Sequence, residues 1–128
     1  MTENSNPTEY RVLARKYRPQ RFVDLIGQET LVQTLSNSIS NDRVAHAYLL
    51  TGVRGIGKTT TARLIAMSMN CESRSSDSFE PCGKCNSCDS IRNDSNIDVI
   101  EMDAASRTGV DDIREIIDNV KYKPVNCK

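Results

Sequence analysis

The hydrophobic positions of this chain recur mainly at helical spacing. Three apolar residues lie four positions apart and share one face of a helix predicted over about 30–40: Leu31, Leu35 and Ile39. Helix-forming residues predict a second helix over 60–70. A third is expected after the sequence Thr108-Gly109-Val110-Asp111, which fits a capping box and precedes apolar residues at helical spacing. These apolar positions are Ile113, Ile116, Ile117 and Val120.

Two shorter apolar runs predict buried strands at 46–51 and 97–103. The first run opens with His46, the single histidine of the chain, which we interpret as structural. The order strand, helix, strand, helix predicts an α/β fold with parallel strands and right-handed crossovers. Because the sequence supplies no third strand, we expect a parallel sheet that is truncated after its second strand.

Polar composition marks off two further segments. Residues 1–9 are expected to form a disordered tail, and 10–128 a single, incomplete domain. Within that domain, Pro19 is expected to end any helix that begins near Val12. Residues 71–96 form an insertion rich in Ser, Asp, Asn and Cys, which is too polar to build a core of its own.

Charge and hydropathy narrow the class of protein. Lys plus Arg and Asp plus Glu both number 17, so the zero net charge predicts no long-range attraction to nucleic acid. Apolar residues make up 38% of the chain, which suffices for a modest core. No apolar run approaches the roughly 18 to 20 residues of a membrane span, and the N-terminus lacks a secretory signal. We therefore expect a cytoplasmic protein with no membrane contact.

The most specific motif lies between the first predicted strand and the second predicted helix. Residues 52–59 read Gly-Val-Arg-Gly-Ile-Gly-Lys-Thr, a full match to the phosphate-binding pattern G-x-x-x-x-G-K-[ST]. Backbone N–H groups and the helix N-terminus would bind phosphates, Lys58 would reach the β and γ phosphates, and Thr59 would hold Mg²⁺. The motif predicts binding of ATP or GTP; the alternative is a glycine-rich turn with no ligand. The residues expected at the phosphates are Gly52, Val53, Arg54, Gly55, Ile56, Gly57, Lys58, Thr59 and Thr60.

Four cysteines in the polar insertion suggest a metal site. Cys71, Cys82, Cys85 and Cys88 follow the spacing C-x10-C-x2-C-x2-C. Four thiolates suit a structural Zn²⁺, and four protein ligands leave no open position for catalysis. A redox C-x2-C pair and unmetallated thiols are the alternatives. Cys127 lies outside the set and is expected to be a small buried thiol or an incidental one.

Several segments together resemble one protein family. They are 13–19 (Leu-Ala-Arg-Lys-Tyr-Arg-Pro) with Phe22 and 25–28 (Leu-Ile-Gly-Gln), the phosphate loop with Thr59 and Thr60, the four cysteines, and 103–112 (Asp-Ala-Ala-Ser-Arg-Thr-Gly-Val-Asp-Asp). With these residues the chain resembles the N-terminal part of the bacterial DNA polymerase III gamma/tau subunits. The resemblance extends from about residue 10 to residue 124. The combination of cysteines with the 103–112 segment is much more specific than the phosphate loop alone.

The resemblance implies a P-loop NTPase of the AAA+ type, the ATPase motor of the clamp loader. Such a subunit works in a ring-like hetero-oligomer with other clamp-loader subunits, which places a sliding clamp on primed DNA during replication. Residues of the matching N-terminal segment would surround the adenine: Tyr17, Arg18, Pro19, Leu25 and Ile26. Their alternative is ordinary packing. Arg107 and Thr108 match a segment that contacts DNA phosphate in the family. The alternative is that Thr108 caps the helix and Arg107 is solvated.

The resemblance also predicts what these 128 residues lack. The family continues beyond 122–124 into a strand that ends in paired acidic residues, which position Mg²⁺ and polarise the attacking water. We therefore expect this chain to bind ATP but hardly to hydrolyse it, with no catalytic residue of its own and no polymerase active site. Two alternatives are a zinc-stabilised interaction module with a silent phosphate loop, and another AAA+ ATPase such as a DNA-repair motor.

Overall fold

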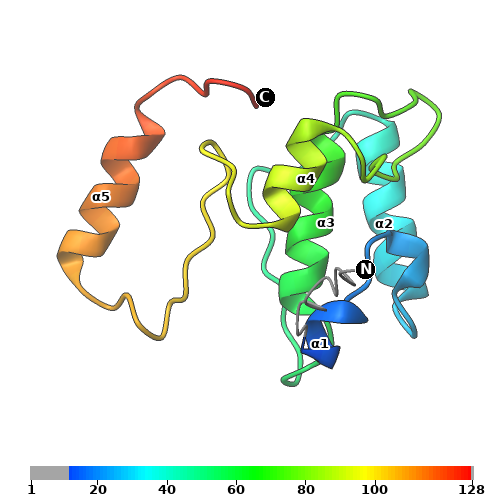
Figure 1. The fold of residues 1–128 in the computed structure, drawn as a ribbon, viewed down its shortest axis with the longest axis horizontal. Helices are drawn as coiled ribbons and strands as arrows, with labels where there is room; N and C mark the ends of the chain where they lie inside the picture. The colour runs from blue at the N-terminus through cyan, green and yellow to red at the C-terminus, as the bar shows by residue number, and fades with distance from the viewer. Residues whose placement is uncertain (1–11, 128) are drawn as a thin grey trace, which may run out of the picture.

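The computed structural model describes residues 12–127, and this part of the chain is helical (Figure 1). Its elements are α1 (Leu13–Lys16), the 3-10 helix η1 (Phe22–Asp24), α2 (Glu29–Ser40), α3 (Lys58–Asn70), α4 (Asn86–Arg92) and α5 (Val110–Val120). The three helices expected from periodicity correspond to α2, α3 and α5, and α1 ends before Pro19 as predicted. The tail predicted at 1–9 lies outside the described residues.

The two predicted strands do not form, so the expectation of a parallel sheet is wrong for this structure. Between residues 12 and 127 no segment is paired as a strand, and 46–51 and 97–103 run as irregular backbone. Leu49 and Ile97 are 90% and 75% exposed, and His46 is exposed too. A strand needs a neighbour to satisfy its backbone N–H and C=O groups, whereas a helix satisfies most of its own. Apolar patterning alone therefore did not produce a sheet.

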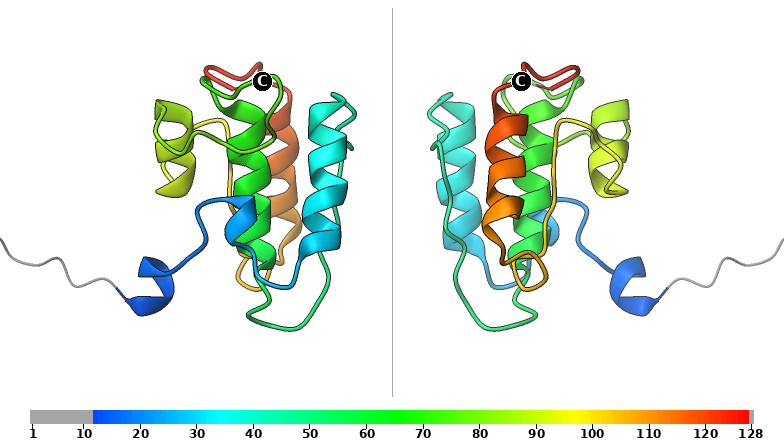
Figure 2. Two further views of the ribbon diagram at one scale, coloured as in Figure 1. Left: turned by 90° about the vertical axis from the view of Figure 1, so that its right-hand side faces the viewer. Right: turned by 90° about the vertical axis from the view of Figure 1, so that its left-hand side faces the viewer.

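The core lies between η1, α2, α3 and α4 (Figure 2). Its buried members are Phe22, Leu25, Leu35, Leu64, Ile65, Met67, Cys88 and Ile91. The polar insertion contributes to this core through α4, a helix that the sequence patterning did not predict. The α4 residues Cys88 and Ile91 lie three positions apart on one helical face, and they are 0% and 3% exposed. The insertion thus buries its few apolar side chains in the core of the rest of the chain.

Helix α5 begins one residue later than the predicted capping box. Its N-cap is Gly109, whose N–H donates to the Asp112 carboxylate at 3.1 Å, so the expected pair Thr108 and Asp111 does not form the box. In a capping box the N-cap residue lies three positions before the acidic residue that accepts from its N–H. Because Asp112 is the acceptor here, the N-cap is Gly109. In Figure 1, α5 stands apart from the other helices, and none of its residues is buried.

Residues 125–127, which follow α5, contact the loop at 96–98, mainly through the carboxylate of Asp98. Asp98 accepts hydrogen bonds from the backbone N–H groups of Val125, Asn126 and Cys127 at 2.8, 2.6 and 2.9 Å. The Cys127 thiol also lies 3.6 Å from the Asn96 side-chain oxygen. These amide donors, Val125 first, lower the pKa of Asp98. Because the bonds favour the ionised carboxylate, the contact is a charge-dependent clip.

Asp98→Asn is expected to release this clip. The folded pKa lies below the ordinary aspartate value of about 3.9, so the contribution to stability is complete above that value. It is lost as the pH falls through the lower, folded pKa. In wild-type protein the amides of 125–127 should therefore stay protected down to about pH 4, whereas Asp98→Asn should leave them unprotected even at pH 7. Amide hydrogen exchange measures both.

Asp94→Asn is the matched control for this exchange experiment. Asp94 has a positive φ of 55°, a conformation that asparagine also adopts readily. The substitution removes the same charge four residues before Asp98 and should leave exchange at 125–127 unchanged. Wild-type exchange rates in Asp98→Asn would contradict the proposed role of the carboxylate.

Candidate functional site

The phosphate-loop sequence forms a tight turn into the N-terminus of α3. Gly57 is the N-cap with a φ of +101°, a left-handed conformation that a residue with a Cβ adopts only at a cost. Its carbonyl accepts from both the N–H and the Oγ1 of Thr61, at 2.8 and 2.9 Å. The Lys58 ammonium donates to the carbonyls of Gly52 and Val53 at 2.8 Å each. The Lys58 side chain thus lies along the loop, with its ammonium group at the carbonyls that begin the loop.

A cavity of about 680 Å³ lies beside this loop, a volume typical of a small-molecule site. Its walls come from two parts of the chain that are distant in sequence, 14–28 and 54–60. The lining residues are Ala14, Tyr17, Arg18, Pro19, Asp24, Leu25, Ile26, Gln28, Arg54, Gly55, Ile56, Gly57, Lys58, Thr59 and Thr60. One helix N-terminus and one largely apolar wall therefore face a common space.

The lining can be compared with the residues expected from sequence. All five residues expected near a base line the cavity: Tyr17, Arg18, Pro19, Leu25 and Ile26. Of the phosphate-loop residues, 54–60 line it. Gly52 and Val53 do not, and they contact Lys58 instead.

The walls of the cavity differ in how firmly they are held. Leu25 is 9% exposed and belongs to the core, while Ile26 is 95% exposed and Tyr17 is 71% exposed. Leu25 therefore forms a firm wall, and the other two side chains lie at the open rim.

Sequence reasoning missed three lining residues: Ala14, Asp24 and Gln28. None belongs to a chemical motif: Ala14 lies in α1, Asp24 in η1, and Gln28 is the N-cap of α2. Among the residues that line this cavity, Asp24 is the sole carboxylate, and it lies in η1 rather than in the phosphate loop. Thr59 is exposed at the second position of α3, where a hydroxyl is free to approach a cation beside a phosphate.

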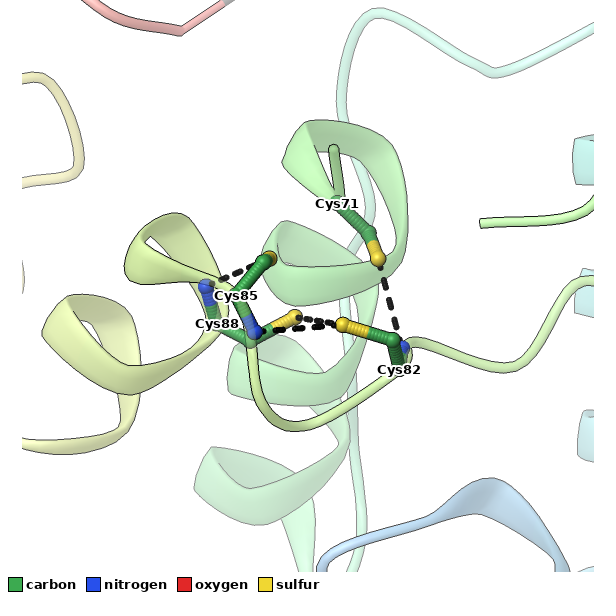
Figure 3. A group of neighbouring side chains, drawn as sticks. All are labelled: Cys71, Cys82, Cys85 and Cys88. Atoms are coloured by element: carbon green, nitrogen blue, oxygen red, sulfur yellow. Dashed lines mark hydrogen bonds between the residues drawn. The ribbon is translucent and has the colours of Figure 1, made fainter. Parts of the chain in front are cut away.

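The four cysteines converge on one point (Figure 3). Cys71 follows the last residue of α3, Cys82 lies in the loop, Cys85 is the N-cap of α4, and Cys88 lies within α4. Their sulfur atoms all lie within 4.8 Å of one another. A tetrahedral zinc with Zn–S bonds of about 2.3 Å separates its sulfurs by about 3.8 Å, so only small shifts are needed. The group fits a tetrahedral metal ion such as zinc.

Backbone amides point at these sulfurs. Lys84 N and Cys85 N donate to the Cys82 sulfur at 3.4 and 3.2 Å, and Cys82 N donates to the Cys71 sulfur at 3.3 Å. The hydrogen bonds from the Lys84 and Cys85 amides lower the pKa of Cys82 to about 6. Burial raises the pKa of Cys71 and of Cys88. A buried thiol with no cation resists ionisation, and a bound metal supplies the compensating charge.

The two residues expected at DNA phosphate lie away from this cavity. Arg107 and Thr108 are exposed in the turn before α5. The Arg107 guanidinium lies 3.5 Å from the Glu115 carboxylate one turn into that helix. The two side chains are 48% and 65% exposed, so this ion pair is weak and leaves the guanidinium accessible.

Comparison with known proteins defines the class. A family model described as DNA polymerase III, delta subunit, matches residues 27–128, a range that contains the phosphate loop and all the cysteines. Proteins of this family are of the AAA+ clamp-loader type. The chain belongs to this family of DNA polymerase III subunits.

Individual relatives point to a narrower group. The chain is 51% identical to the DNA polymerase III subunit tau/gamma of Haemophilus influenzae and 50% identical to the subunit tau of Bacillus subtilis. It is 49% identical to the subunit gamma of Buchnera aphidicola. These matches cover 91%, 90% and 93% of this chain, and they confirm the gamma/tau resemblance.

The same matches cover only part of each relative. The chain spans 17%, 20% and 32% of the length of these three relatives. None of the helices within 12–127 is long and apolar enough to cross a membrane.

Proposed function

We propose that this chain provides the ATP-binding part of a clamp-loader motor, which places a sliding clamp on primed DNA during replication in the cytoplasm. The single observation that carries the proposal is the phosphate-loop turn at the N-terminus of α3, which opens on a cavity with a largely apolar wall. In such a complex the chain would assemble with other loader subunits. Its enzymatic role would be ATP hydrolysis within the DNA polymerase III holoenzyme, and no polymerase chemistry is proposed for these residues.

The two walls of the cavity divide the recognition of ATP. The N–H groups of 55–59 and the α3 dipole would bind the phosphates, with Lys58 leaving its two carbonyl partners for the β and γ phosphates. Thr59 would bind Mg²⁺. Leu25 and Pro19 offer apolar contact to a base. Asp24, the one acid of the lining, lies on the base side, so we infer that residues 12–127 bind ATP without activating water.

For the four cysteines we propose a structural zinc. Support comes from the short distances between the sulfurs and from the N–H donors that face them. When bound, the ion would join the C-terminus of α3 to the start of α4. Four thiolates would saturate it, so it would stabilise the insertion and take no part in hydrolysis.

Arg107 and the exposed N-terminus of α5 are the part of the chain that we propose for DNA phosphate. A guanidinium beside helix N–H groups suits phosphate, and such a contact carries no base sequence information. The ion pair with Glu115 would open when phosphate binds, at a small cost because both groups are solvated.

Titration of Mg²⁺–ATP into the full chain tests the central proposal. We expect one ATP to bind per chain, with heat detected by calorimetry, and we expect inorganic tripolyphosphate to bind more weakly because it lacks the base. Protein that is folded by circular dichroism and holds zinc, yet binds neither ligand, would contradict the proposal. A chain that binds ATP and fails to turn it over would support the division between binding and hydrolysis.

A further inference from the structure

A carboxylate from the cysteine insertion holds the segment that forms one wall of the nucleotide cavity. The Glu80 side chain accepts hydrogen bonds from the backbone N–H groups of Phe22 and Val23, each at 3.0 Å. Glu80 lies 58 residues from Phe22 in sequence. Phe22 and Val23 are the first two residues of η1, and the first N–H groups of a helix have no acceptor within that helix. Glu80 therefore supplies the acceptors that this short helix lacks.

The same junction is packed by aromatic side chains. Phe22 is 0% exposed, and its ring centroid lies 5.4 Å from that of Phe79, the neighbour of Glu80. The Phe79 carbonyl accepts a hydrogen bond from Ser68, a fully buried residue of α3. The position of Glu80 is thus set by two contacts of the residue before it. A carboxylate held in this way can in turn set the position of η1.

Glu80 connects the two sites directly along the chain. On one side, Cys82 follows it after the buried Pro81, and the Cys82 N–H donates to the sulfur of Cys71. On the other side, Val23 is followed immediately by the cavity residues 24–26. Leu25 belongs to the same buried cluster as Cys88, and Cys71, Cys82 and Cys85 pack against that cluster. The conformation of the cysteine group can therefore influence the position of the base-side wall at 24–26 through the Glu80 side chain.

We propose that Glu80 is a positioning residue for nucleotide binding: it couples the four-cysteine module to the wall that contacts the base. The inference rests on the proposed binding of ATP. Without the carboxylate, the buried Phe22 amide has no acceptor, so η1 loosens to reach water. The base-side wall at 24–26 then loses its fixed position, whereas the phosphate loop at 52–60 keeps its own contacts. Base recognition should fall and phosphate recognition should remain.

The test compares two ligands in the full chain. Glu80→Ala is expected to weaken Mg²⁺–ATP binding by about 5- to 20-fold. This range assumes that part of the free energy of the two charge-assisted hydrogen bonds contributes to the affinity for ATP. Binding of tripolyphosphate should stay within about twofold of wild type, because it uses the loop alone. Glu80→Gln keeps one acceptor oxygen and should bind ATP with an intermediate affinity. Zinc content should remain at one per chain in both variants.

Asp77→Asn is the matched control. It removes one negative charge from the same loop, and its side chain accepts a hydrogen bond from the adjacent Ser76 hydroxyl at 3.4 Å. Its ATP affinity should equal that of wild type. Equal losses for ATP and tripolyphosphate in Glu80→Ala would assign Glu80 a general structural role and overturn the proposal, as would unchanged ATP affinity. If wild-type protein binds neither ligand, the proposed function itself fails, and that result is distinct from both.

Discussion

Lys58→Ala is expected to weaken Mg²⁺–ATP binding by about 30- to 150-fold, which corresponds to about 2–3 kcal/mol for a lost charge-assisted contact. The ammonium is the sole cationic group that the phosphate-loop pattern directs at the β and γ phosphates. Alanine is a good helix former at the first position of α3, so the helix should persist. Calorimetry of the purified variant measures the change in affinity.

Lys121→Ala is the control for this lysine substitution. Lys121 pairs with Asp118 at 2.8 Å on exposed surface and is not among the residues that line the cavity. The net charge changes by the same amount, so its ATP affinity should stay at the wild-type value. Comparable losses in both variants would indicate a general effect of charge and contradict the role of Lys58.

Loss of the proposed zinc from the cysteine group is the second large effect that we expect. Cys88→Ser is expected to abolish stoichiometric zinc binding and to lower the unfolding temperature by about 10 °C, since structural zinc contributes several kcal/mol to folding. Cys88 is 0% exposed, so the change also leaves a hydroxyl in the core that α4 shares with η1, α2 and α3. Native mass spectrometry measures zinc content, and thermal unfolding measures stability with and without a chelator.

Cys127→Ser separates the metal effect from cysteine chemistry in general. Cys127 lies outside the group of four, and its thiol contacts Asn96. This variant should keep one zinc and unfold within about 2 °C of wild type, as a change in a partly exposed side chain does. A chelator that lowers the unfolding temperature of Cys88→Ser as much as that of wild type would contradict the assignment of the metal site.

The convergence of Cys82, Cys85 and Cys88 and the turn of the phosphate loop were both predictable because each depends on short spacings. A C-x2-C unit brings two sulfurs together over one turn, and Gly57 and Lys58 are neighbours whose geometry follows from local backbone rules. The helices α2, α3 and α5 were predictable for the same reason, because their hydrogen bonds join residues four apart. The helix α4 escaped prediction since its apolar face is short, and Cys88 was read as a ligand rather than as a core residue.

The strands show the limit of such reasoning. The run at 46–51 has the composition of a buried strand, yet it lies largely exposed because no segment within 12–127 pairs with it. The clip from Asp98 to 125–127 and the contact from Glu80 to Phe22 were equally invisible in the sequence. Neither belongs to a motif, and each joins residues that are far apart in the chain.

The sequence by itself determined the chemistry of this protein: the phosphate-loop residues, the four thiols and the family to which they point. Local spacing carries most of that information, since the phosphate loop and the segment from Cys82 to Cys88 are each continuous and short, and the chain returns from Cys71 within the same insertion. Only the tertiary structure decided which wall faces the phosphate loop, whether α4 joins the core, and that Glu80 accepts hydrogen bonds from the amides of η1. Those outcomes depend on burial and on partners for backbone groups, which are properties of the folded chain as a whole.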